Sequence, residues 1–179
     1  MKNAITLFTI YLLLSCYAIT HAQIINNGTI SKGEKDNSAS KYEGFQISRT
    51  DLFEALTTVD PSLHFKETPK TKGLPQFTAI GSNAAHVEIT GSENNITNAV
   101  WILAYDITKT INKDAISRMA FFVNTLTKQE GAIWLFQQIF AVNNTPTIIV
   151  STSTNINGSK VLFFYDPSKK TISVTITIA

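Results

Sequence analysis

One pair of residues in this sequence has the types and the spacing of an acid–base site. His86 and Glu88 are two residues apart in the segment 84–90, where polar and apolar side chains alternate. In a β-strand both side chains point to the same face. Such a pair can exchange protons with a substrate or supply two metal ligands. The simpler interpretation is the polar face of a half-buried strand.

Two further residues, Ser82 and Asp106, could complete a hydrolase around His86. Ser82 lies in a Gly-Ser turn, and Asp106 follows an apolar segment. Their spacing does not by itself assemble a Ser-His-Asp set. The chain also lacks the G-x-S-x-G, H-E-x-x-H and phosphate-binding glycine motifs. We therefore predict no metal and no cofactor, and a small secreted hydrolase that uses His86 with Glu88 or Asp106 is an alternative.

Aromatic residues crowd the second half of the chain and favour a binding function. Neighbouring phenylalanines at 121 and 122 diverge by about 100° on a helix, and those at 163 and 164 point to opposite faces of a strand. One core cannot take all of them, so some aromatic surface must contact a second layer, a ligand or a partner. The predicted binding residues are Phe121, Trp134, Phe140 and Phe164, and the predicted partner is a protein or a hydrophobic small molecule.

Composition limits the remaining classes of function. The chain has 179 residues, of which 44% are hydrophobic and 16% charged, which suits one globular domain. Fifteen basic and 13 acidic residues give a net charge of +2. Since no strong positive field results, we expect no nucleic-acid partner.

The N-terminus predicts export. Lys2 precedes the apolar run 5–14, and small residues at 20 and 22 follow, as in a signal peptide cleaved after Ala22. We expect residues 23–44 to be a flexible polar segment and residues 45–179 to be one domain. Export and an asparagine- and lysine-rich composition favour a bacterial protein in the periplasm or outside the cell. In the alternative interpretation Cys16 is acylated, which would make the protein a lipid-anchored structural component of the envelope.

The periodicity of the domain predicts an α+β fold. We expect the order α-βββ-αα-βββ, with two three-strand meanders in one antiparallel sheet and the helices on one face. The capping pattern of Ser48 and Asp51 begins the expected helix 49–59, and the Asp60-Pro61 step ends it. The other expected helices are 113–128 and 132–142, which are separated near Gly131. The expected strands are 77–82, 84–90, 97–105, 147–153, 160–165 and 171–178. Asn157-Gly158 predicts a hairpin turn, and apolar and polar residues alternate in the last strand. The helix 132–142 is apolar around most of its circumference, which is typical of a buried helix. The uncharged last strand could pair with a second copy if it lies at a sheet edge, which would give a homodimer.

Overall fold

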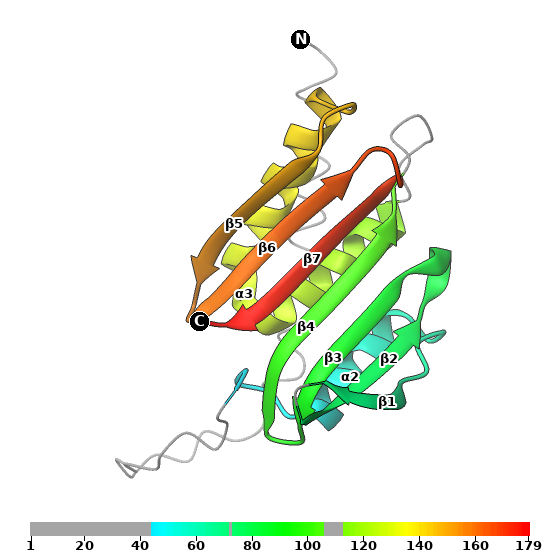
Figure 1. Cartoon of the computed structure of the whole chain (residues 1–179), viewed down its shortest axis with the longest axis vertical. Helices are drawn as coiled ribbons and strands as arrows, with labels where there is room; N and C mark the ends of the chain where they lie inside the picture. The colour runs from blue at the N-terminus through cyan, green and yellow to red at the C-terminus, as the bar shows by residue number, and fades with distance from the viewer. Residues whose placement is uncertain (1–43, 72, 106–112) are drawn as a thin grey trace. The chain divides into compact units, whose positions relative to one another are not determined.

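The computed structural model describes residues 44–71, 73–105 and 113–179, which belong to one compact unit of the chain (Figure 1). Four sequence-based predictions fall outside these residues: the signal peptide 1–22, the lipidation of Cys16, the flexible segment 23–44 as far as residue 43, and the role of Asp106. None of the described helices is long and apolar enough to cross a membrane.

The described chain contains two α-helices, one short 3₁₀ helix and seven strands. The helices are α2 (Arg49–Val59), α3 (Lys113–Asn144) and η1 (Ser82–Ala84), and the strands are β1 (Lys66–Thr71), β2 (Leu74–Ile80), β3 (His86–Ser92), β4 (Asn95–Ala104), β5 (Val150–Ile156), β6 (Ser159–Asp166) and β7 (Thr171–Ile178).

All seven strands form one antiparallel sheet in the order β1-β2-β3-β4-β7-β6-β5. The α+β class with an antiparallel sheet is therefore confirmed. The prediction of two three-strand meanders is wrong, because β1 adds a fourth strand to the first meander. The sequence KETPKT of β1 contains no large apolar residue and includes Pro69, which is tolerated because this strand lies at the sheet edge.

The register separates an apolar face of the sheet from an open face. One row of paired residues runs through Phe77, Ile89, Ala99, Ile176 and Val161 on the apolar face. Helix α3 contacts β4, β5, β6 and β7 on this face, and the ring of Phe122 lies 5.4 Å from that of Trp101. Phe53 of α2 contacts Phe77 on the same face. Both helices therefore cover one face of the sheet, and the opposite face carries no described helix.

Helix α2 begins where the capping pattern predicts. The Ser48 hydroxyl accepts a hydrogen bond from the Asp51 backbone N–H at 3.0 Å, and Leu52 and Leu56 are buried. Asp60 ends the helix as its C-cap.

Helix α3 is one element with an internal break, where the sequence predicted two helices separated near Gly131. The break lies at Lys128, whose φ of 65° and ψ of −172° are not helical. The Asn157 side chain donates a 2.9 Å hydrogen bond to the carbonyl of Thr127, the residue before the break. Gly131 is buried within the helix, and a Cβ added there would collide with the Thr127 side chain.

The last strand lies inside the sheet, between β4 and β6. Its alternation is as predicted, with Ile172, Val174 and Ile176 buried on the apolar face. Since β7 presents no free edge, a homodimer that pairs through this strand is excluded.

Candidate functional site

His86 and Glu88 contact each other, as the strand pattern predicts. The His86 Nε2 lies 2.8 Å from the Glu88 Oε1, and Gln76 donates a 3.1 Å hydrogen bond to the other carboxylate oxygen. Both side chains are half-buried on the open face of the sheet, in register with Ile102 and Val100 of β4. A pair on an open sheet face meets water and lacks the concave surroundings that favour catalysis.

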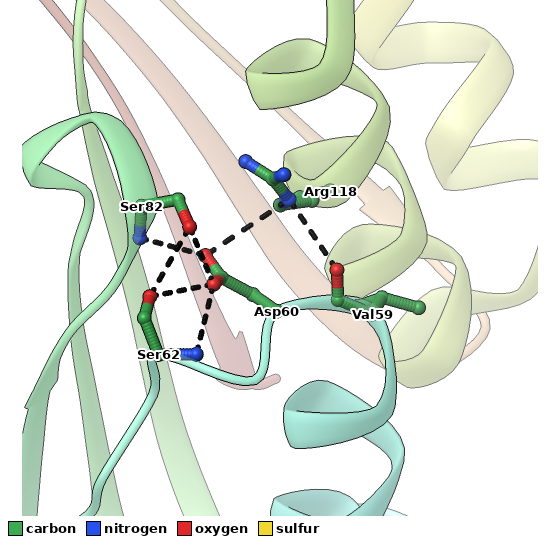
Figure 2. A network of polar contacts seen from close by, with 5 residues as sticks. All are labelled: Val59, Asp60, Ser62, Ser82 and Arg118. Carbon is green, nitrogen blue, oxygen red and sulfur yellow. Dashed lines mark hydrogen bonds and ion pairs between the residues drawn. The ribbon is translucent and has the colours of Figure 1, made fainter.

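Ser82 belongs to a different network, shown in Figure 2, which is centred on Asp60. Asp60 is fully buried, and its Oδ1 accepts hydrogen bonds from the hydroxyls of Ser62 at 2.6 Å and Ser82 at 2.8 Å. Its Oδ2 accepts one from the Ser82 backbone N–H at 2.9 Å. Asp60 was not a candidate from sequence, because its Asp-Pro step indicated only the end of a helix.

Arg118 closes this network from α3. Its Nε donates to the Val59 carbonyl at 3.3 Å and lies 4.0 Å from the Asp60 Oδ2. Burial raises the pKa of Asp60, but the hydrogen bonds from Ser62 and Ser82 outweigh it and hold the pKa below its ordinary value. A carboxylate with these partners anchors the chain between α2 and β1 to the turn at Ser82. We interpret the network as structural, since the Ser82 hydroxyl already donates to Asp60.

The four predicted aromatic binding residues do not form one site. Phe121 and Trp134 are partly buried against the core, and Phe164 is half-buried on the open face of the sheet. Phe140 is 63% exposed. The divergence of neighbouring aromatics is confirmed, because Phe122 and Phe163 are fully buried while their neighbours are not.

The expectation that 132–142 is a buried helix is wrong for its outer side. Leu135, Ile139 and Val142 face the sheet and are buried. Ile133 and Phe140 are seven residues apart, which places them within about 20° of each other around the helix. Both are exposed, Ile133 by 51%, because the fold has a single layer of helices and nothing described covers α3 from outside. Phe136 lies between them and is partly buried.

An uncharged stretch of sequence coincides with this exposed surface. No charged residue occurs from Gly131 through Ser159, which covers the second part of α3, the following loop and the edge strand β5. Exposed Ile148 and Ile149 lie in that loop. This gap in the charge pattern is the signal by which the sequence could have identified the surface. We call Ile133, Phe136 and Phe140 the α3 stripe.

A small cavity lies near the break in α3. Its volume is about 250 Å³, and its lining includes Phe45, Leu126, Lys128, Asn157, Gly158 and Ile178. None of the predicted site residues lines it. Within the described ranges, no group of three or more His, Cys, Asp or Glu side chains could hold a metal ion.

In comparisons with known proteins, no family model, no curated protein and no solved structure matches this chain.

Proposed function

We propose that this protein is a non-enzymatic binding protein that docks a protein partner on the α3 stripe. The observation that carries the proposal is the exposure of Ile133 and Phe140 on one side of a helix, within a stretch of chain that has no charge. Large apolar side chains exposed together on one side of a helix are typical of an interaction site.

A protein fits this surface better than a small molecule. Small ligands bind in concave sites that enclose most of their surface. The α3 stripe is instead a convex helix ridge, and the cavity near Phe45 lies apart from it, lined by other residues. A ridge with apolar side chains at positions i, i+3 and i+7 matches the recognition of a helix by an apolar groove. The partner would supply that groove.

The proposal includes export from a bacterial cell, on the strength of the N-terminal sequence pattern. The lipid-anchored alternative at Cys16 and the hydrolase alternative at His86 remain separate predictions. Of these the hydrolase has less support, because His86 and Glu88 lie on the open sheet face and Ser82 donates to Asp60.

Photo-crosslinking in the organism of origin tests the α3 stripe. A photoreactive phenylalanine analogue at position 140 is compared with the same analogue at Thr57, which lies on α2. We expect a discrete crosslinked protein from position 140 alone. Substitution of Ile133 by Ala should reduce that product, whereas substitution of the exposed neighbour Gln137 by Ala should not. Identical products from positions 140 and 57 would contradict the proposal.

A further inference from the structure

The two edge strands of the sheet differ in how well they are protected against pairing with another chain. Strand β1 forms one edge and carries Lys66, Glu67 and Pro69. Charged residues and proline at an edge discourage pairing with another chain. Strand β5 forms the other edge, has the sequence VSTSTNI and contains neither a charge nor a proline. Only the β5 edge therefore lacks the usual protection against strand addition.

The β5–β6 hairpin determines which backbone groups face outward. Ile156 pairs with Ser159 across the two-residue turn Asn157-Gly158, whose φ values are 51° and 76°. In such a hairpin the pair that closes the turn is hydrogen-bonded, and bonded pairs then alternate along the ladder. Ile156, Thr154 and Thr152 thus direct their backbone groups to β6. Ser151, Ser153 and Asn155 direct theirs to the open edge.

We propose that a second copy of this chain pairs with the β5 edge, antiparallel and centred on Ser153. In this register Ser153 faces Ser153 of the second copy, and Ser151 faces its Asn155. The backbone N–H and C=O groups that point outward from the two β5 strands then hydrogen-bond to each other, so that β5 is paired along its whole length. Since β1 is protected, the contact is between identical surfaces and closes after two copies, which gives a dimer rather than a fibre.

Side chains at the ends of β5 fit the same register. Ile148 and Ile149 directly precede β5 and are exposed in the single chain. In this register they lie near the Asn157-Gly158 turn of the second copy, where the paired strands end. The dimer therefore brings two exposed isoleucines close to the second copy, once on each side of the twofold axis.

This dimer is independent of the α3 stripe. A twofold axis perpendicular to the sheet keeps the helices of both copies on the same face of one continuous sheet. Ile133 and Phe140 point away from the sheet and stay exposed, so failure of one proposal leaves the other standing.

Disulfide trapping tests the register directly. In the full-length chain with Cys16 replaced by Ser, Ser153→Cys is compared with Ser151→Cys. Directly opposed residues of a hydrogen-bonded pair have Cα atoms about 5.5 Å apart, within disulfide range. Two cysteines at 151 would be displaced by four residues, about 13 Å along the strands. We expect a crosslinked dimer from Ser153→Cys alone. Equal crosslinking of both variants, or none of either, would overturn the register.

Analytical ultracentrifugation of the full-length chain tests the dimer itself. We expect twice the chain mass for the wild type. Ser153→Pro, which removes an outward N–H from an edge strand, should weaken association at least tenfold while circular dichroism is unchanged. Ile149→Asp should also weaken it, whereas Ile80→Asp should not, although the two isoleucines are 60% and 61% exposed. A wild-type monomer, or a folded Ser153→Pro variant that remains dimeric, would overturn the proposal.

Discussion

Replacing Asp60 by Asn tests whether the Asp60 network is structural. The carboxylate accepts four hydrogen bonds, two from Ser62 and two from Ser82, while fully buried. An amide can keep the three bonds to Oδ1 through its oxygen. Its NH₂ group would then face the Ser82 backbone N–H and the Arg118 Nε, and these groups are all donors.

The expected loss follows from that arrangement. A hydrogen bond to a charged group contributes about 1.5–3 kcal/mol, and an unsatisfied buried donor costs about 1–3 kcal/mol. We expect Asp60→Asn to lower the free energy of unfolding by about 3 kcal/mol. Urea denaturation followed by the fluorescence of buried Trp101 measures this. A loss below about 1 kcal/mol would refute the structural interpretation, because it lies under the contribution of one charged hydrogen bond.

Asp60 should also make the free energy of unfolding depend on pH. The hydrogen bonds hold the folded-state pKa of Asp60 below its ordinary value of 3.8. Its contribution to stability is therefore fully present above that value and is lost as the pH falls through the lower folded-state pKa. Between pH 7 and pH 5 the wild type should keep its full stability advantage over Asp60→Asn, and the advantage should shrink as the pH falls below 3.8 towards the folded-state pKa. An advantage that is already lost at pH 5 would contradict the assigned contacts.

Four further substitutions test the packing and the open face, each by urea denaturation. Phe163→Ala should lower the free energy of unfolding by about 3–5 kcal/mol, because this ring is fully buried. Phe164→Ala, on the open face, should lower it by less than half as much. Equal losses would contradict the assignment of the two residues to opposite faces. Gly131→Ala should lower the free energy of unfolding by about 1–2 kcal/mol, because overpacking against the Thr127 side chain outweighs the gain in helix propensity. A variant more stable than the wild type would contradict the close contact between Gly131 and Thr127. His86→Ala should lower the free energy of unfolding by at most about 1 kcal/mol, as expected of a partly exposed contact between polar side chains. A larger loss would show that the pair supports the fold.

Local patterns predicted the elements they encode directly. The Ser48 cap and the apolar spacing of Leu52 and Leu56 gave α2 with its observed bounds. The Asn157-Gly158 turn and the alternation of β7 were also identified correctly, because each depends on neighbouring residues alone.

Features that depend on distant contacts were missed or misplaced. Strand β1 has no apolar alternation, since it is an edge strand held by its pairing with β2. The break at Lys128 is accompanied by a hydrogen bond from Asn157, which is distant in the sequence. The helix 132–142 was expected to be buried, and the exposure of Ile133 and Phe140 reflects the absence of a described layer outside α3. Sequence reasoning placed His86 beside Glu88 correctly, but it could not show that the pair lies on an open face.

The size of the protein's complex in its own host tests the central claim most directly. Extracts from cells that produce the wild type or Phe140→Asp are separated by sedimentation, and the protein is detected in each fraction. Because a buried charge at the centre of an apolar contact is costly, we predict that the wild type sediments in a complex larger than its own dimer. The Phe140→Asp variant should sediment at the size of the isolated protein. Identical sedimentation of the two would contradict the claim that the α3 stripe binds a partner.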